Sequence, residues 1–387
     1  MPRVSLVGGN QLRLLQCGTE FFPAMLKAFE EARAEIHLET YIFELDKVGQ
    51  QVVDALIRAA ARGVQVYVIT DWVGTGRAQS TRLHQSLLQG GVHHRTFNPW
   101  FRRGLSRTHR KICVIDRRSA FIGGININDD FFSDDDSHTP LPAERWDFAV
   151  EIHGPLAATI LVEAESQWMR LGALKLKARW HLFKARKQAH AHTADTGVLA
   201  GLVMRDNLRN RRTIQHAVIA ALNEAQHSAL LATPYFAPGR KLRDALARAA
   251  SRGVDVTLLL GVGQFRIQDE VAHSFYPKLL GSGVRVVEYH RTQLHAKVAV
   301  VDRDWATIGS SNYDGLSLFI NQEANLVVRD PLFAAGLRTR IEGAVAVGVA
   351  VSPADFANIG RLQRIWYGAA YFLYSGLLRL VTLGKYS

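Results

Sequence analysis

Apolar and polar residues change along the first third of the chain in short blocks that predict strands and helices in turn. Helices are predicted where apolar residues recur every three or four positions, and strands where short apolar runs are bounded by turn residues. The predicted strands are 11–17, 35–43, 64–70 and 92–97, and the predicted helices are 21–34, 49–61 and 81–89. This alternation predicts an α/β sandwich.

The second half of the chain repeats this plan. Strands are predicted at 229–234 and 254–261, with a helix at 239–251 between them. The text AAARGVQVYVI at 59–69 returns as AASRGVDVTLL at 249–259, an offset of 190 residues that is far too long for a solenoid repeat. The pattern therefore predicts that a whole domain was duplicated and that two similar α/β domains face each other.

One stretch occurs in both halves with the same polar residues at the same spacing. HRKICVIDRRSAFIGGIN at 109–126 returns as HAKVAVVDRDWATIGSSN at 295–312. The shared positions are His109, Lys111, Asp116, Gly123, Gly124 and Asn126 in the first copy and His295, Lys297, Asp302, Gly309, Ser310 and Asn312 in the second. A single HxK pattern carries little information, but agreement at six positions, of which five are identical and one is a small residue in both copies, is not a coincidence.

The spacing within each copy predicts where these side chains point. Residues 109–115 alternate as a strand does, and positions two apart on a strand share a face, so His109 and Lys111 point the same way. Asp116 lies at the far end on the opposite face, which favours a turn or a structural ion pair. The glycines let the backbone approach a ligand closely, and Asn126 can donate amide hydrogens to it. Because a face of His and Lys is costly to bury unless it serves an anion, the pattern favours an anion site over two plain core strands.

The doubled pattern resembles the paired HKD motifs of the phospholipase D superfamily, and the flanking text resembles the bacterial cardiolipin synthases of the short, B-type subfamily. The matching stretches include residues 38–66, 205–212, 234–242 and 305–326, and the resemblance extends over most of the chain, from about Val7 to Asp330. It implies two duplicated phospholipase D-like α/β sandwich domains, with mixed β-sheets flanked by helices and the active site at the domain interface.

The resemblance also implies roles for particular residues. The catalytic set is His109, Lys111, Asp116, His295, Lys297 and Asp302, and the residues expected to bind the substrate phosphate are Asn126 and Asn312. Asp147 and Glu323, a little downstream of each motif, are implied to orient the histidines. Of the two histidines, His109 is expected to be the nucleophile and His295 the general acid and base.

Two such motifs at one cleft would suit the cleavage of a phosphodiester. Two lysines offset the negative charge of the phosphate, one imidazole attacks phosphorus to form a phosphohistidine, and the other protonates the departing alkoxide and later deprotonates the incoming alcohol. Cationic side chains do here what a metal does elsewhere, so neither a metal nor a cofactor is expected. No Cys or His spacing resembles a zinc site.

The amino-acid composition favours anionic binding partners but does not distinguish between the possible kinds. The net charge of +12 favours anionic lipids, phosphate esters or nucleic acid. The two cysteines, Cys17 and Cys113, give no disulfide framework and are compatible with a reducing compartment. The sequence shows no signal-peptide pattern, and no uncharged apolar run reaches the ~18 residues of a membrane-spanning helix. The oligomeric state is left open.

Two basic segments with interleaved apolar residues lie between and after the domains. Residues 170–192 contain no acidic residue and fit a solvated linker helix and an interfacial segment equally well, whereas 361–387 predicts a basic amphipathic helix for which membrane contact is favoured over packing on the core. The predicted division is 1–170 for the first phospholipase D-like domain, 171–204 for a basic linker, 205–347 for the second domain and 348–387 for a C-terminal tail.

The resemblance implies a phosphatidyltransferase that makes cardiolipin from two phosphatidylglycerol molecules and releases glycerol. Such an enzyme would be a peripheral protein on the cytoplasmic face of the bacterial inner membrane, with anionic phospholipids as its partners. A phospholipase D-type hydrolase and a nucleic-acid phosphodiesterase use the same motifs and are the alternatives. Nucleic acid is disfavoured because basic and aromatic residues gather in the two basic segments rather than along a groove. A non-catalytic membrane scaffold is disfavoured because both motifs are intact. The loop 99–107 is shorter than in B-type sequences and leaves the choice of acceptor open.

Overall fold

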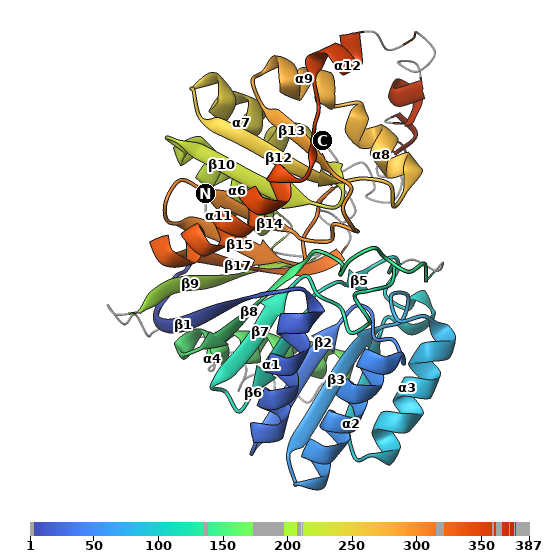
Figure 1. Cartoon of the computed structure of the whole chain (residues 1–387). Coiled ribbons are helices and arrows are strands. Elements are labelled where there is room, and N and C mark those ends of the chain that lie inside the picture. Colours follow the sequence, from blue (N-terminus) through green and yellow to red (C-terminus); the bar gives the residue numbers. More distant parts are fainter. Residues whose placement is uncertain are drawn as a thin grey trace.

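The computed structural model describes residues 4–134, 138–172, 197–206, 210, 212–314, 321–357, 360, 366–370, 372–374 and 376. Two α/β lobes lie against each other, one built from the blue to green part of the chain and the other from the yellow to red part (Figure 1). The predicted pair of α/β domains that face each other is confirmed.

The first lobe follows the predicted alternation of strands and helices. Its elements are β1 Val7–Gln16, α1 Cys17–Glu31, β2 Glu35–Thr40, α2 Lys47–Ala61, β3 Gln65–Asp71, α3 Arg77–Gln89, β4 His93–Phe97, the 3-10 turn Pro99–Phe101, β5 Arg107–Thr108, β6 Ile112–Ile115, β7 Ser119–Gly123, β8 Phe148–His153 and α4 Pro155–Leu171. Each strand and helix predicted up to residue 97 is present within a few residues of its expected bounds.

The second lobe repeats this order. Its elements are β9 Val198–Arg205, α6 Thr213–Glu224, β10 Ser228–Thr233, β11 Phe236–Ala237, α7 Arg240–Ser251, β12 Asp255–Gly261, α8 Arg266–His273, α9 Tyr276–Gly281, β13 Arg285–Tyr289, β14 Val298–Val301, β15 Trp305–Gly309, β16 Tyr313–Asp314, β17 Asn321–Arg329, α11 Pro331–Ala346, β18 Val349–Ala350 and α12 Pro353–Ala357. Strand β9 lies almost wholly within the range that the sequence assigned to the linker.

The sheets of the two lobes are joined edge to edge. In the described part of the chain, sixteen strands form one sheet in the order β18-β13-β12-β10-β14-β15-β17-β9-β1-β8-β7-β6-β2-β3-β4, with β5 paired to β17. The parallel strands of each lobe, β2-β3-β4 and β10-β12-β13, flank an antiparallel motif hairpin, β6-β7 or β14-β15. The antiparallel pair β1 and β9 connects the lobes.

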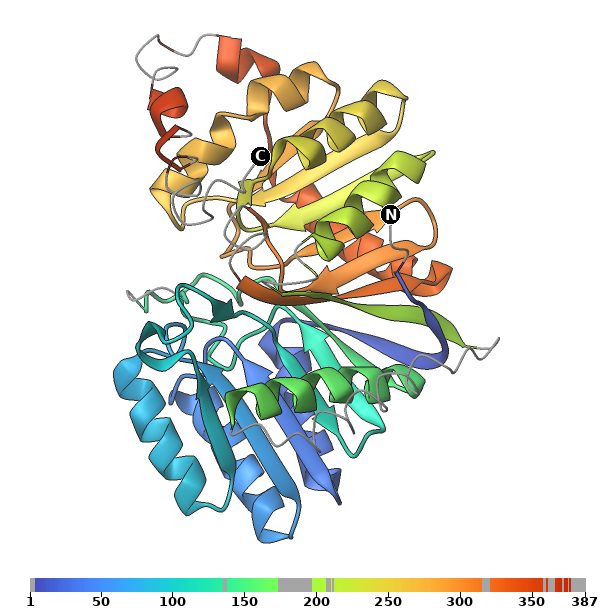
Figure 2. The same ribbon diagram turned by 180° about the vertical axis from the view of Figure 1, so that it is seen from behind.

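Helices cover both faces of the sheet because its central strands are apolar on both sides. In β6, Ile112 and Val114 belong to the core beneath α4, while Cys113 and Ile115 belong to the core beneath α1 and α2. This is the two-residue period of a strand. Figure 2 shows α4 lying across the sheet of the first lobe.

One of the hydrophobic cores runs through both lobes. It includes Ile160 of α4 and Val150 of β8 in the first lobe and Leu326 of β17 and Leu337 of α11 in the second, all fully buried. Separating the lobes would expose this apolar surface to water, at a cost of about 25 cal/mol for each Å². The shared core therefore holds the two motifs at a fixed distance from each other.

Matching backbone conformations confirm the duplication. Gly63 and Gly253, which follow α2 and α7, have φ of 90° and 88°. Asp116 and Asp302, at the ends of β6 and β14, have φ of 51° and 48°, which is uncommon for residues other than glycine. The same strained turn is therefore kept at the same place in both copies.

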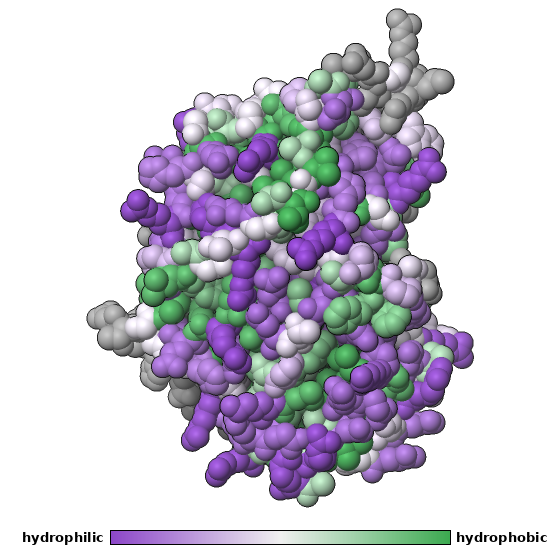
Figure 3. Space-filling model, viewed as in Figure 1, coloured by the Kyte–Doolittle hydropathy of each residue, from purple (hydrophilic) through white to green (hydrophobic). Residues whose placement is uncertain are grey.

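The described part of the C-terminal tail both packs on the second lobe and exposes apolar side chains. Tyr367 and Ala370 are buried, and the Tyr367 ring lies 5.8 Å from the ring of His273, whereas Phe372 and Leu373 are 76% and 66% exposed. None of the described helices is long and apolar enough to span a membrane. The face seen in Figure 3 is mainly hydrophilic, with hydrophobic residues in separate patches. The expected linker helix, 170–192, lies mostly outside the described residues.

Candidate active site

The histidine and lysine of each motif lie just before a strand and not on it, so the expected strand from residue 109 was wrong. Strand β6 begins at Ile112 and β14 begins at Val298. The backbone N–H of His109 donates to the carbonyl of Gln322, and that of His295 donates to the carbonyl of Trp146, each at 2.9 Å. Each motif is thus tied to the opposite lobe where the strand was expected.

The histidines and the two predicted carboxylates are paired crosswise between the lobes. Nδ1 of His109 lies 3.0 Å from Oε2 of Glu323 and 3.0 Å from the carbonyl oxygen of Ser310. Nδ1 of His295 lies 2.6 Å from Oδ2 of Asp147. A carboxylate at Nδ1 fixes the tautomer of each ring and leaves Nε2 for chemistry.

The two lysines lie in the same buried cluster. Nζ of Lys111 donates to the carbonyl of His109 at 3.0 Å, and Nζ of Lys297 donates to the carbonyl of His295 and lies 4.0 Å from Oδ2 of Asp147. Burial and the charge of Lys297 lower the pKa of Lys111 to about 7, and burial lowers the pKa of Lys297 to about 8. A bound anion would raise both values, so the cluster is suited to a phosphate.

The two histidine centres differ in their electrostatics. Burial lowers the pKa of both imidazoles, and the pKa of His295, which also feels Lys297 and Lys111, falls well below its ordinary value. Burial raises the pKa of the Asp147 carboxyl to about 6. Burial acts in the same direction on Glu323, but attraction to His109 and hydrogen bonds from His109 and Ser310 lower its pKa.

The small residues of the motifs make room for these carboxylates. A Cβ atom on Gly124 would lie 2.4 Å from Oδ1 of Asp147. At the matching position of the second motif, Oγ of Ser310 donates to Oε2 of Glu323 at 2.5 Å. The expectation that this position lets the backbone approach a ligand is therefore corrected, because the neighbouring carboxylate takes the space.

The structure does not bring the motif aspartates to the histidines. Asp116 accepts the backbone N–H groups of Arg33, Ala34 and Glu35 at 2.8–2.9 Å. Asp302 accepts those of Gln226, His227 and Ser228 at 2.8–3.0 Å. Both aspartates therefore lie where they can stabilise a turn, and the catalytic role that the resemblance implied stays a prediction.

Both predicted phosphate-binding asparagines, which are the last residues of the two motifs, are buried. Oδ1 of Asn126 accepts the backbone N–H of Ile42 at 3.3 Å, and its Nδ2 has no partner among the described residues. Oδ1 of Asn312 is likewise buried without a described partner. Since buried polar atoms are nearly always hydrogen-bonded, these amides are suited to contact a ligand.

Several residues of this cluster were missed by the sequence analysis. The Tyr41 ring lies 4.8 Å from the ring of His109 and 5.3 Å from Nζ of Lys111. Arg145, 1% exposed, lies 3.3 Å from Oδ1 of Asp130 and donates to the Phe132 carbonyl at 2.6 Å. Its place two residues before Asp147 was the one signal that could have drawn attention to it.

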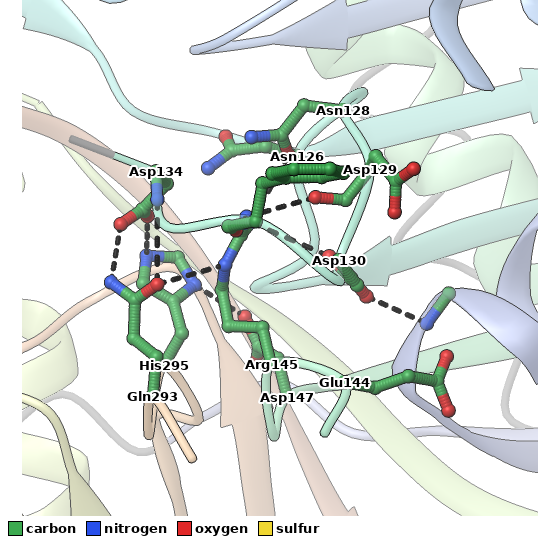
Figure 4. A network of polar contacts seen from close by, with 12 residues as sticks. Asn126, Asn128, Asp129, Asp130, Asp134, Glu144, Arg145, Asp147, Gln293 and His295 are labelled. Carbon is green, nitrogen blue, oxygen red and sulfur yellow. Dashed lines mark hydrogen bonds and ion pairs between the residues drawn. The ribbon is translucent and has the colours of Figure 1, made fainter. Parts of the chain in front are cut away.

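Asp134 was also missed, because it stands in an acidic run that is typical of a solvated loop. Its side chain is instead 7% exposed, and its Oδ2 lies 3.4 Å from Nε2 of His295 (Figure 4). His295 is thus flanked by carboxylates at both ring nitrogens.

A group with metal-ligand geometry lies away from this cluster. In the part of the chain that the structure describes, Glu35, His37 and Glu165 have ligand atoms within 4.8 Å of one another. Glu35 already pairs with His37 at 3.1 Å and with Arg117 at 2.6 Å. Glu35 and His37 lie at the start of β2, next to the turn that Asp116 stabilises, and Glu165 lies on α4.

Comparison with known proteins agrees with the geometry. Residues 25–140 and 218–344 match the family described as cardiolipin synthase, PLD-like domain. Cardiolipin synthase B of Salmonella typhimurium is 38% identical over 345 residues, which cover 87% of this chain and 81% of that protein. The Escherichia coli K12 protein of the same name is 36% identical with the same coverage. The chain belongs to the cardiolipin synthase family of the phospholipase D superfamily.

More distant relatives and solved structures extend this result. Cardiolipin synthase A of Pseudomonas aeruginosa is 30% identical over 373 residues, which cover 94% of this chain and 73% of the Pseudomonas protein. The crystal structure of phosphatidylserine synthase from Haemophilus influenzae superposes with a TM-score of 0.70 at 14% identity, covering 98% of this chain and 97% of the other. Polyphosphate kinase from Porphyromonas gingivalis gives a TM-score of 0.56 at 14% identity, and the match covers 95% of this chain and 56% of the kinase. At these identities the structures show a shared fold.

Proposed function

We propose that this chain is a phosphatidyltransferase that makes cardiolipin from two phosphatidylglycerol molecules through a covalent phosphatidyl-histidine intermediate. The observation that carries the proposal is the crosswise pairing of His109 with Glu323 and of His295 with Asp147 around two buried lysines. This arrangement supplies a nucleophile, an acid and base, and a positive site for one phosphate.

In the first step, Nε2 of His109 attacks phosphorus. The carboxylate of Glu323 holds the proton on Nδ1 and offsets the positive charge that develops on the ring. His295 enters this step as the imidazolium, which Asp147 and the bound phosphate stabilise, and its Nε2 proton passes to the glycerol oxygen as the bond from that oxygen to phosphorus breaks. Lys111 and Lys297 stabilise the additional negative charge on the phosphoryl oxygens.

In the second step, the phosphatidyl group passes to a hydroxyl group of a second phosphatidylglycerol. His295 accepts the proton of that hydroxyl, its oxygen bonds to phosphorus, and the bond to His109 breaks. Transfer competes with hydrolysis by water at the same phosphorus. The low exposure of the two histidines, 8% for His109 and 4% for His295, supports transfer because it limits the access of water.

Lipid mass spectrometry with phosphatidylglycerol vesicles tests this proposal. We expect cardiolipin and glycerol in equal amounts from the wild-type protein and neither product from His109→Ala. Phosphatidic acid as the sole lipid product would instead identify a phospholipase D-type hydrolase. Cleavage of single-stranded DNA without any lipid turnover would identify a nucleic-acid phosphodiesterase.

We further propose that the protein acts at an anionic membrane surface, on the cytoplasmic face of the inner membrane. Trp100, Phe101 and Leu105 are 56%, 46% and 48% exposed in the loop that leads into His109, and the same loop carries Arg102 and Arg103. Exposed aromatic and basic residues together favour the interface of an anionic bilayer.

Flotation with phosphatidylglycerol vesicles tests this membrane surface. The double variant Trp100→Ser and Phe101→Ser should bind the vesicles at least about thirtyfold more weakly, since each ring contributes on the order of 1 kcal/mol or more at an interface and about 1.4 kcal/mol is a factor of ten. Leu332→Ser is the matched control, because Leu332 is 84% exposed on α11. Equal binding by the double variant and the control would exclude this loop as the contact.

A further inference from the structure

The reactive side of His295 faces a carboxylate that the proposed transfer steps do not use. Nδ1 of His295 is occupied by Asp147 at 2.6 Å, so the alcohol must meet Nε2. Oδ2 of Asp134 lies 3.4 Å from that same nitrogen (Figure 4). Any alcohol that reacts through His295 therefore arrives next to Asp134.

Asp134 is held firmly in this position. Its Oδ1 accepts hydrogen bonds from the side-chain amides of Gln264 at 2.7 Å and Gln293 at 2.5 Å. The other end of each amide is also occupied, since Oε1 of Gln293 accepts from Nε of Arg145 at 3.3 Å and Oε1 of Gln264 accepts from the hydroxyl of Tyr235 at 2.8 Å. These contacts leave Oδ2 directed at His295.

The space between Asp134 and His295 calls for hydrogen-bond donors. A neutral imidazole that donates from Nδ1 to Asp147 presents only a lone pair at Nε2, and Oδ2 of Asp134 also presents lone pairs. Their separation of 3.4 Å exceeds that of a good hydrogen bond. Two neighbouring hydroxyl groups fit this pair, because one can donate to Nε2 and the other to Oδ2.

We propose that Asp134 binds the hydroxyl next to the one that reacts at His295, and so selects a vicinal diol as the acceptor. The glycerol headgroup of phosphatidylglycerol is such a diol, and in this respect the inference rests on the proposed function. The reacting hydroxyl gives its proton to Nε2 of His295 while its oxygen bonds to phosphorus. The bond from phosphorus to His109 breaks, and its electron pair returns to the imidazole. Asp134 accepts a hydrogen bond throughout and takes no proton.

An amino alcohol fits this position less well than a diol. A carboxylate alone would attract the ammonium group of ethanolamine. Arg145, Lys111 and Lys297 are each at least 94% buried in the same cluster, and their positive charges oppose a further cation. Neutral hydroxyl groups avoid this repulsion and still satisfy Oδ2.

A competition between alcohols tests the proposal with the full-length protein. The donor is bis(p-nitrophenyl) phosphate, whose leaving group departs without a general acid, so formation of the phosphoenzyme does not depend on the surroundings of His295. The phosphoenzyme then partitions between 1,2-propanediol and 1-propanol at equal concentration, and the two diester products are measured by mass spectrometry. Because both products come from one intermediate, their ratio does not depend on the amount of folded protein.

The wild-type protein should favour 1,2-propanediol by at least about tenfold, which corresponds to about 1.4 kcal/mol. Asp134→Asn, which keeps the shape of the side chain, should bring the ratio close to one. Asp129→Asn is the matched control and should keep the wild-type ratio, because Asp129 lies in the same loop with its carboxylate bound to the backbone N–H of Phe131 at 2.9 Å.

Three results would overturn the proposal. They are a wild-type ratio close to one, an unchanged ratio in Asp134→Asn, and, in a second competition with ethanolamine in place of 1-propanol, a preference of the wild type for ethanolamine over the diol. If Asp134→Asn lowers the yields of both diesters by the same factor, the ratio is unchanged, and this result also overturns the proposal. Preference for the diol without cardiolipin formation from phosphatidylglycerol would refute the proposed function alone, and the absence of transfer from either donor would refute both.

Discussion

The two motifs have the same backbone conformation, but their histidines lie in different chemical surroundings. His109 faces Glu323, whose pKa is lowered and which also receives the hydroxyl of Ser310. His295 faces Asp147, whose pKa burial raises to about 6, and it has a second carboxylate, Asp134, at its other nitrogen. Duplication therefore produced two similar backbone arrangements, and a few different side chains make the two histidine sites chemically different.

This difference supports different roles for the two histidines. An ionised Glu323 can offset the positive charge of a phosphohistidine, which favours His109 as the nucleophile. Burial lowers the pKa of His295 and so favours its neutral form, which has a lone pair at Nε2 for the proton of an alcohol, and this nitrogen lies beside Asp134, where an alcohol can be recognised. The following predictions test this asymmetry, starting with the largest expected effect.

Replacing either histidine with asparagine should lower the turnover of phosphatidylglycerol by at least about a thousandfold, since general acid–base catalysis alone contributes about 10²–10⁴. With bis(p-nitrophenyl) phosphate, however, His295→Asn should still form a phosphoenzyme, whereas His109→Asn should not. Intact-protein mass spectrometry would detect the added phosphoryl group. A phosphoenzyme in His109→Asn and none in His295→Asn would reverse the two roles.

Exchanging the small residues of the two motifs should have unequal effects. Gly124→Ser should lower activity about a hundredfold, because its Cβ would lie 2.4 Å from Oδ1 of Asp147 and displace the carboxylate from His295. Ser310→Gly removes one hydrogen bond to Glu323 and should lower kcat about tenfold, since a charged hydrogen bond contributes about 1.5–3 kcal/mol.

Gly336→Ser is the control for both exchanges, since among the described residues no atom outside the adjoining turns of its own helix lies within 4 Å of a Cβ added there. It should keep wild-type activity and melting temperature. Equal losses in Gly124→Ser and Ser310→Gly would show that the two positions are equivalent after all.

The buried lysines should make activity fall in alkaline solution. Because the pKa of Lys111 is lowered to about 7 and that of Lys297 to about 8, both lose their charge as the pH rises through these values. The value of kcat/KM, which reports the free enzyme, should therefore fall by up to about tenfold per pH unit for each lysine. Bound phosphate favours the charged form, so kcat should change less.

Lys297→Arg would sharpen this test, because a guanidinium group stays charged over the whole range. The alkaline fall of kcat/KM should be shallower in this variant than in the wild type. A kcat/KM that rises between about pH 7 and pH 9 would contradict the assignment of the lysines to phosphate binding.

The motif aspartates should affect stability and leave the chemistry intact. Asp116→Asn and Asp302→Asn should each lower the free energy of unfolding by about 1–2 kcal/mol, through weaker bonds to backbone N–H groups, with kcat within about twofold of the wild type. Thermal unfolding and lipid turnover measure the two effects. A loss of turnover without a loss of stability would restore the catalytic role.

For Asp302 the effect should also depend on pH. Burial opposes ionisation, but three backbone hydrogen bonds lower its pKa below the ordinary value of 3.8. A lowered pKa stabilises the fold at pH values above the unfolded value and loses this contribution as the pH falls through the folded value. The difference in stability between the wild type and Asp302→Asn should therefore disappear in strong acid.

Much of the fold followed from local patterns. The apolar period of a helix and the glycine after it located α2 and α7, and the apolar runs located β3 and β12, because these signals depend on neighbours along the chain. The strand predicted from residue 109 failed for the opposite reason. The backbone of His109 is bonded to Gln322, and nothing in the local sequence indicates that partner.

The sequence by itself determined the duplication and the two motifs, because both are repeated spacings, and the family resemblance of these motifs pointed to Asp147 and Glu323 as candidates. Only the tertiary structure decided which carboxylate serves which histidine, since the partners are 214 and 148 residues apart and belong to opposite lobes. Only the structure shows that Asp134, which the sequence places in an acidic run, lies next to Nε2 of His295. Contacts between the lobes depend on how two folded surfaces pack together, and the pattern of apolar and polar residues along the chain does not predict this packing.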